Sequence, residues 1–204
     1  VTRKDVKKPV MTTFYNSEAN PKETFNKHQL AAFYESLDDT LPGALDVMEA
    51  VNQYWDYESD IHMWTLPDGH VARVPVTEMN NIRIEVDELN HRTFTYRYNK
   101  QQPSENYRSL VANIVHSVDG YVAREMVRRC HPMKIELVHI HDCFVFSPDH
   151  LQTVCQTYRE ILAEIANSDL LSDILSEISG NYVPVTKLST DLAKDILNSE
   201  YMLS

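Results

Sequence analysis

A histidine and an aspartate stand side by side in the otherwise apolar stretch VHIHDCFVFSP, residues 138–148. The apolar pattern predicts a buried β-hairpin in which His141 and Asp142 lie where the two strands meet. An ionised carboxylate among Val, Ile and Phe is costly unless a metal, a cation or a phosphate compensates it. At such a turn Asp142 can hold Mg²⁺ through one or two oxygens while a substrate phosphate completes the coordination shell.

Two other interpretations stay open for this stretch. A turn aspartate often accepts hydrogen bonds from its own backbone, which would make Asp142 structural. His139 and His141 alternate along a strand and so share a face, from which they could bind zinc with a third ligand. No HExxH motif or second group of carboxylates and histidines lies nearby in the sequence, which speaks against zinc.

The N-terminal stretch TRKDVKKPVMTTFYNSE offers groups that could bind a polyphosphate. Its spacing predicts a helix with Arg3, Lys7 and Tyr15 along one side, and Pro9 predicts a kink or a helix start in the middle. Two cations one helical turn apart can clamp a polyphosphate, with an aromatic hydroxyl two turns further on. The simpler alternative is an exposed basic helix without a ligand.

Basic side chains concentrate in two segments of a chain whose net charge is −11. Residues 1–8 carry four basic and one acidic side chains, and residues 92–134 carry eight and three. Clustering of one sign matters more for binding a polyanion than the total charge does. The second segment holds His116 in NIVHSVDG and the basic run that includes Arg124 and Arg128. A structural histidine and two solvated faces are the simpler alternatives.

The composition suits one sizeable core: 204 residues, of which 43% are hydrophobic. Three cysteines without CxxC spacing fit a reducing compartment better than a disulfide framework. No signal peptide is evident, and no apolar run is long enough to span a bilayer, so we expect a soluble protein that does not act at a membrane.

The elements expected around these residues mix helices and hairpins. Helices are predicted over residues 26–39, 43–58 and 149–168, the last with Asp149 as N-cap, and a helix interrupted at Asp119-Gly120 over residues 104–130. Strands flanking Pro67-Asp68-Gly69 form a hairpin, and residues 81–89 and 92–99 form a second hairpin or an extended loop. The pattern predicts a single α+β body.

Five segments, in order along the chain, resemble motifs of the single-subunit DNA-dependent RNA polymerases of phages and mitochondria. They resemble the fingers helix, the Trp-x-x-Pro-Asp-Gly hairpin before the promoter-specificity loop, the Pro-Asn-x-x-His-Ser-x-Asp-Gly segment, the palm hairpin His-Asp-Ser-Phe, and the C-terminal foot. In this chain they read RKDVKKPVMTTFYN, HMWTLPDGHV, ANIVHSVDG, IHDCFVFSP and DILNSEYMLS.

The resemblance implies a right-hand polymerase fold, with a fingers helix and the C-terminal part of the palm, whose antiparallel hairpin has flanking helices. Residues 1–60 would be the fingers portion beginning with the nucleotide-binding helix, and residues 61–103 a hairpin and a promoter-specificity loop. Residues 104–204 would be the palm portion, with the metal-binding hairpin and the C-terminal foot.

The activity implied is DNA-templated RNA synthesis from ribonucleoside triphosphates by a two-Mg²⁺ mechanism, with a DNA template and an RNA product as partners. Asp142 would be one of the two metal-binding carboxylates, and His141 would position the palm hairpin. Arg3 and Lys7 would bind the triphosphate, with Lys7 also counted as catalytic, and Tyr15 would lie at the nucleotide's sugar and base.

Six residues would contact nucleic acid by the same resemblance. His116 would meet the minor-groove edge near the growing 3′ end, and the basic segment with Arg124 and Arg128 would follow the template–RNA duplex. The arm from Thr77 to Asn99 would read promoter DNA, with three arginines as candidates because Arg is the usual reader of guanine edges: Arg83, Arg92 and Arg97.

Three departures from the family pattern are visible. Asn16 replaces the Gly expected after Tyr15, and the interval from Tyr15 to Trp64 is short, so the fingers would be reduced. The first metal-binding Asp of the family would lie upstream of the fingers helix. We therefore expect a second polypeptide, or a missing N-terminal part, to supply that carboxylate with the N-terminal domain, the thumb and the rest of the palm. A large, partly apolar partner surface should then exist.

Two other functions remain as alternatives. A DNA polymerase of family A type would share the same fold, but at its palm hairpin it carries a second acidic residue where this chain has Cys143. A non-catalytic, nucleic-acid-binding accessory subunit would keep the fold without the chemistry. The compact fingers and the possible split favour a bacteriophage source, with the protein in the cytoplasm of the infected host or in the virion, over a mitochondrial one.

Overall fold

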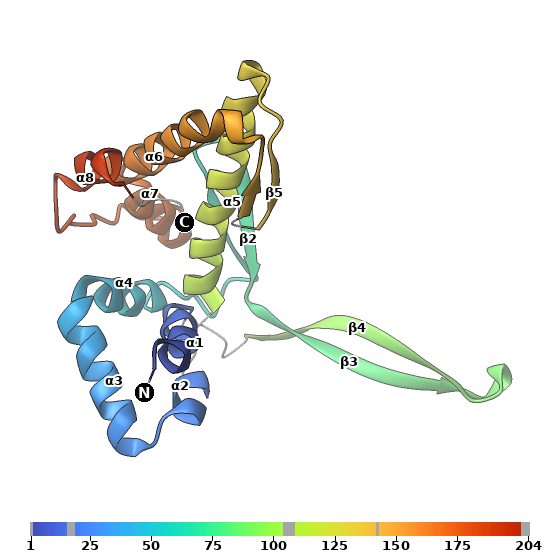
Figure 1. The fold of residues 1–204 in the computed structure, drawn as a ribbon. Helices are drawn as coiled ribbons and strands as arrows, with labels where there is room; N and C mark the ends of the chain where they lie inside the picture. The colour runs from blue at the N-terminus through green and yellow to red at the C-terminus, as the bar shows by residue number, and fades with distance from the viewer. Residues whose placement is uncertain (1, 16–18, 104–108, 142, 201–204) are drawn as a thin grey trace.

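The computed structural model describes residues 2–15, 19–103, 109–141 and 143–200. Helices and small antiparallel sheets alternate along them, which confirms the α+β expectation (Figure 1). The helices are α1 Arg3–Phe14, α2 Ala19–Thr24, α3 Lys27–Thr40, α4 Pro42–Asn52, α5 Ser109–Cys130, α6 Leu151–Asn167, α7 Leu170–Ser179 and α8 Leu192–Asn198. The two-stranded sheets pair β1 Ile61–Thr65 with β2 Val71–Pro75, β3 Thr77–Val86 with β4 Arg92–Pro103, and β5 Val138–Ile140 with β6 Cys143–Val145.

The N-terminal helices α1 to α4 pack around a small core of Phe25, Phe33 and Leu37. Helix α1 begins one residue after Thr2, whose backbone N–H and hydroxyl both donate to the Asp5 carboxylate at 2.8 Å. The helix runs through Pro9, which is buried, so the prediction of a helix start at this residue was wrong. The predicted helices at residues 26–39 and 43–58 are confirmed as α3 and α4, although α4 ends at Asn52, and α2 was not predicted.

Helix α5 is continuous from Ser109 to Cys130, so the predicted interruption at Asp119-Gly120 was wrong. A glycine inside a helix costs about 1 kcal/mol relative to alanine. Tyr121, Val122 and Met126 are buried just after it, and burying a large apolar side chain stabilises by about 1.5–3 kcal/mol. Packing therefore outweighs the helix-breaking tendency of Gly120.

The β1–β2 hairpin is confirmed, with the turn at Pro67-Asp68-Gly69 between strands in register from Ile61↔Pro75 to Thr65↔Val71. Gly69 has φ of +80°, a left-handed conformation that favours glycine. Trp64 is fully buried in the main core and donates from its indole Nε1 to Ser117 Oγ on α5 at 3.0 Å. The hairpin is thereby fixed against the middle of α5.

Strands β3 and β4 form a long two-stranded ribbon that projects away from the rest of the molecule (Figure 1). The hairpin alternative predicted for this region is therefore confirmed. Its tip contains the short 3₁₀ turn Asp87–Leu89, followed by Asn90 and His91 in left-handed backbone conformations. We call this element the ribbon.

Helix α6 packs on α5 through a further core, separate from the two above. It is formed by Val122, Met126 and Cys130 of α5 with Val154 and Ile161 of α6. Helix α6 starts at Leu151, after a 3₁₀ turn at Pro148–His150. The N-cap is His150, so the prediction of Asp149 as N-cap was wrong. No helix in the described part of the chain is both long and apolar enough to cross a bilayer. In Figure 1, α5 joins the α1–α4 group below to α6, α7 and α8 above.

Candidate active site

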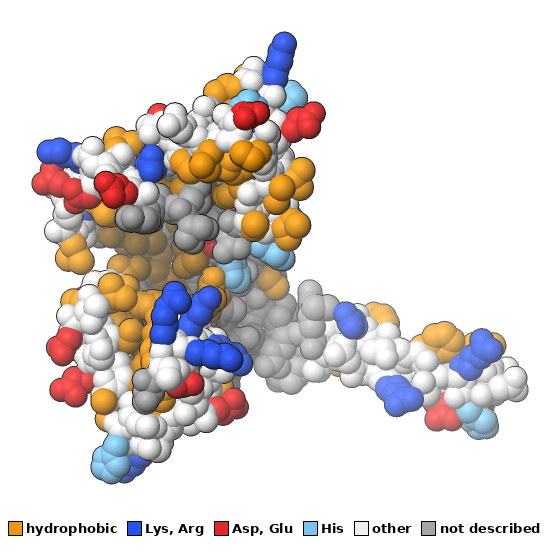
Figure 2. Space-filling model, in the orientation of Figure 1, with side chains coloured by type: hydrophobic (Ala, Val, Ile, Leu, Met, Phe, Trp, Pro, Cys, Tyr) orange, Lys and Arg blue, Asp and Glu red, His pale blue; other side chains and the backbone are white. Residues whose placement is uncertain are grey.

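Helix α1 presents a basic face to solvent. Its opposite side packs Val6, Val10 and Phe14 into the N-terminal core, which leaves Arg3, Lys7 and Tyr15 exposed together, as their spacing predicts. Lys7 and Tyr15 line a surface depression of about 330 Å³ whose rim includes Lys4 and Lys8. Figure 2 shows this blue cluster at the lower edge of a hollow between α1–α4 and the C-terminal helices. The arrangement can hold an anionic ligand across two helical turns.

Tyr15 and His116 lie in ring contact, although 100 residues separate them in the sequence. Their ring centroids are 4.9 Å apart and the planes are tilted by 43°. Tyr15 follows the last residue of α1, and His116 projects from α5 with an exposed side chain. The contact brings two of the predicted site residues together at one end of the basic face of α1, which the sequence alone did not predict.

The β5–β6 hairpin is not buried, and this corrects the argument from its apolar sequence. The register pairs Val138 with Val145 and Ile140 with Cys143. The three apolar residues among them are 62%, 64% and 56% exposed: Val138, Ile140 and Val145. Phe144, which alternates with them, is half-buried and packs toward Tyr158 of α6 at a ring distance of 6.1 Å. Burial therefore does not by itself require a charge at Asp142 to be neutralised.

Asp142 lies outside the described residues, so its coordination is an expectation only. His141, beside it, is exposed and has φ of +55°, a left-handed conformation that suits a tight turn. Mg²⁺ usually binds one or two protein carboxylates and takes its other ligands from phosphates and water. One carboxylate at the turn fits such an ion if further ligands come from another segment.

A zinc site at this hairpin finds no support among the described residues. Among the described residues, three side chains have ligand atoms close enough together to hold a metal ion. They are Glu85, Asp87 and His91, at the tip of the ribbon. His91 Nδ1 lies 3.0 Å from Glu85 Oε1 and 3.2 Å from Asp87 Oδ1. These contacts hold the exposed tip together, and His139 and His141 are not part of them.

Two arginines predicted to bind nucleic acid have carboxylate partners inside the molecule. Arg124 forms an ion pair with Asp68 of the β1–β2 turn and lowers the pKa of that carboxyl, chiefly by hydrogen bonding. Arg128 pairs with the buried Glu125, whose pKa is lowered first by the Arg128 hydrogen bonds, against the effect of burial. The positive charge of both arginines is therefore compensated by carboxylates of the same chain.

The three arginines assigned to the ribbon lie on different faces. Residues opposite each other in the register share a face, so Arg83 and Arg97 lie together with Asn81, Glu85, Thr93 and Thr95. Arg83 donates to Thr93 Oγ1 at 3.1 Å. Arg92 lies on the other face, opposite the half-buried Val86. Further from the tip, that face carries exposed apolar and aromatic side chains: Ile82, Ile84, Phe94 and Tyr96. The sequence alternation contained this division, but the prediction grouped all three arginines.

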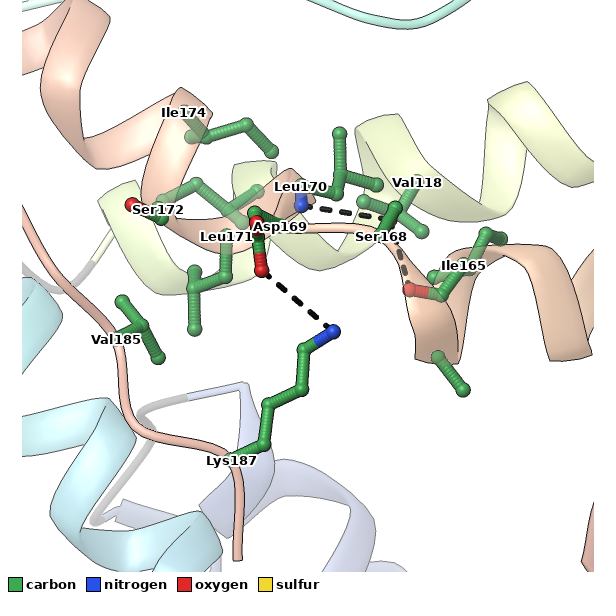
Figure 3. Close-up of a pocket in the computed structure, with 12 residues that line it drawn as sticks. Val118, Ile165, Ser168, Asp169, Leu170, Leu171, Ser172, Ile174, Val185 and Lys187 are labelled. Atoms are coloured by element: carbon green, nitrogen blue, oxygen red, sulfur yellow. Dashed lines mark hydrogen bonds and ion pairs between the residues drawn. The ribbon is translucent and has the colours of Figure 1, made fainter. Parts of the chain in front are cut away.

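An apolar cavity of about 260 Å³ lies between α5, α6 and α7 (Figure 3). Ile114 and Val118 line it from α5, and Lys187 lies at its edge, 3.6 Å from Asp169 Oδ1. His116 is two residues from each of these α5 positions, or about 200° around the helix, and so faces away from the cavity. The cavity therefore brings none of the predicted site residues together.

A family model of DNA-dependent RNA polymerase matches residues 53–201, which include His116, the ribbon and the β5–β6 hairpin but not α1. No curated protein matches the chain. The matched range covers well over half of the sequence. The chain therefore belongs to the DNA-dependent RNA polymerases of the single-subunit, phage and mitochondrial type.

Proposed function

We propose that this chain forms the nucleotide-binding and palm portions of an RNA polymerase with a right-hand fold. The observation that carries the proposal is the contact between Tyr15 and His116 at one end of the basic face of α1. It joins a residue outside the family match to one inside it, which supports the assignment of α1 to the same site as the matched region. Family membership supplies the reaction class, DNA-templated RNA synthesis.

In this proposal α1 binds the incoming ribonucleoside triphosphate. Arg3 and Lys7 meet the phosphates, because charge-assisted hydrogen bonds to cations are the strongest contacts available to them. Tyr15 lies against the sugar and base, and His116 meets the nucleic acid next to the growing 3′ end. Phosphoryl transfer depends mainly on positioning and on stabilisation of phosphate charge, which cations on a rigid helix can provide.

Asp142 would supply one carboxylate for Mg²⁺, and His141 would set the conformation of the turn that presents it. When bound, the metal ions would supply charge neutralisation at the transferring phosphate. A second polypeptide, or an N-terminal part of the same protein, would contribute the other carboxylate. The exposed apolar faces of β5–β6 and of the ribbon support such a partner, because large exposed apolar patches usually mark interfaces.

The ribbon would read promoter DNA with its polar face. A two-stranded ribbon fits the major groove of B-DNA, where Arg can bind guanine through two hydrogen bonds. Arg83 and Arg97 share that face, whereas Arg92 lies at the tip on the apolar face and would contact the phosphate backbone. Arg124 and Arg128 would contribute least to binding of the template–RNA duplex, because each has an internal partner.

The deciding experiment is transcription by the complete polymerase carrying Asp142→Asn. We expect RNA synthesis to fall by at least about 10³-fold, since a metal-ligand carboxylate is lost, while DNA binding stays within about twofold. The exposed Asp39→Asn on α3 is the matched control and should change neither. Undiminished synthesis would remove Asp142 from the mechanism and favour a non-catalytic accessory subunit.

A further inference from the structure

A wide surface groove of about 890 Å³ runs between the C-terminal end of α5 and the outer side of α6. Arg129 and Met133 line it on the α5 side, and Leu151, Gln152 and Arg159 line it on the α6 side. Most of the side chains that line it are polar or charged, and Met133 and Leu151 add apolar surface. The groove contains none of the residues assigned above to nucleotide, metal or promoter DNA.

Arg159 differs from the arginines of α5, because no carboxylate in the described part of the chain forms an ion pair with it. Its Nε is buried without a hydrogen-bond partner, and no ion pair joins it to any described residue. Arg129 in the same groove pairs with both Glu125 and Glu164, at 3.0 and 2.5 Å. A buried donor without a hydrogen-bond partner destabilises the protein, and more so when the group is charged. A carboxylate from outside the described chain would compensate the charge of the guanidinium.

The surroundings of Arg159 favour one isolated carboxylate over a polyanion. Glu160 lines the same groove and Glu164 is exposed one turn further along α6, so a phosphate backbone would meet negative charge beside the arginine. Gln152 adds a neutral donor and acceptor. Met133 and Leu151 are 46% and 54% exposed and would cover apolar side chains next to the carboxylate. Charge and polarity together fit an acidic residue within an apolar protein segment.

We propose that this groove binds a protein segment in which an Asp or Glu flanked by apolar residues pairs with Arg159. The occupant is the polypeptide that completes the polymerase, and in that identification the inference rests on the proposed function. The carboxylate pairs with the part of the Arg159 guanidinium that faces the groove, and the apolar neighbours cover Met133 and Leu151. The groove thus anchors the partner at a site remote from the chemistry of α1.

Photo-crosslinking in the complete polymerase tests the proposal. A benzophenone amino acid replaces Gln152, and the matched control replaces the exposed Asp38 on α3. We expect the groove position to crosslink to a polypeptide segment outside residues 1–204 that contains an Asp or Glu among apolar residues. Crosslinks to nucleic acid, or yields no higher than at Asp38, would overturn the proposal.

Substitution of the arginine gives an independent measurement. Arg159→Met should weaken association with the partner by about 10- to 100-fold, because it removes a desolvated charge pair, and Arg159→Lys should recover part of it. The exposed Arg73→Met is the matched control. In this chain alone, Arg159→Met should leave the melting temperature unchanged or raise it, whereas Arg129→Met should lower it. Loss of melting temperature without any change in association would show a purely internal role.

RNA synthesis measured on the same samples separates the two proposals. A polymerase that makes RNA without a crosslink at residue 152 would contradict the groove and leave the proposed function standing. A crosslinked assembly in which Asp142→Asn transcribes normally would contradict the proposed function alone.

Discussion

At the scale of single residues, the contacts of the site residues matter more than their types. The ring contact between Tyr15 and His116 supports a shared role for these two residues. The ion pairs of Arg124 with Asp68 and of Arg128 with Glu125 weaken the case that the two arginines bind nucleic acid. The residue types were all visible in the sequence. Their partners were not, because each pairing depends on how helices and hairpins far apart in the chain come together.

His62 should make the stability of the chain depend on pH. It is buried beside Trp55 and accepts a hydrogen bond from the Asp56 N–H on Nε2 at 3.2 Å. Burial lowers its pKa, against a smaller opposing effect of Asp56. The unfolded chain therefore takes up a proton first, so the stabilisation is complete above the unfolded pKa of about 6.5 and is lost as pH falls below it.

The measurement is urea unfolding between pH 7.5 and 5.5. The free energy of unfolding should fall with a slope of up to about 1.4 kcal/mol per pH unit from this group. His62→Gln should remove that contribution to the slope, while the exposed His28→Gln should leave the slope unchanged. An identical pH profile for wild type and His62→Gln would contradict the assignment.

At the scale of elements, tertiary packing decided where local sequence signals were ambiguous. The turn residues at Pro67-Asp68-Gly69 and the alternation in the ribbon predicted both hairpins, because turn chemistry and a period of two are local properties. Gly120 misled the prediction for α5, since a single glycine cannot reveal what packs around it. The apolar β5–β6 strands predicted burial, but composition does not say which face meets a core.

Gly120→Ala tests the continuity of α5. An added Cβ would lie 3.2 Å from Arg124 Nη1, the far end of a side chain that can shift. Helix propensity should therefore raise the free energy of unfolding by up to about 1 kcal/mol. Gly69→Ala, at φ of +80°, is the comparison and should lower it by about 1–2 kcal/mol. Thermal and urea unfolding measure both, and destabilisation of similar size at the two positions would indicate a break in the helix.

The two faces of the ribbon should respond differently to substitution. Arg83→Met and Arg97→Met should each weaken specific promoter binding by about 1–3 kcal/mol and relax preference for one base pair. A phosphate contact by Arg92 predicts instead a uniform loss across sequences and a salt slope reduced by about one for Arg92→Met. Binding titrations with promoter and scrambled duplexes at several salt concentrations distinguish them. Equal losses on both duplexes for Arg83→Met would contradict the assignment of faces.

At the scale of the whole molecule, the distribution of exposed side chains is the main feature that the fold adds to the sequence. Exposed apolar side chains gather in two places, on β5–β6 and on one face of the ribbon, and a groove with Arg159 lies between α5 and α6. Family membership was within reach of the sequence because five short motifs keep their order. The exposed faces and the unsatisfied arginine were not, because exposure depends on the fold.

The alternation of the ribbon also constrains how its length can change. Side chains change face at every residue. Adding one residue to each strand would therefore move every arginine between the insertion and the tip to the opposite face of the ribbon. Adding two to each strand restores the faces and extends the ribbon by about 6.8 Å, or roughly two base-pair steps of DNA. Related polymerases with longer or shorter ribbons should therefore differ by even numbers of residues per strand, so that reach varies in steps while the polar face stays in phase.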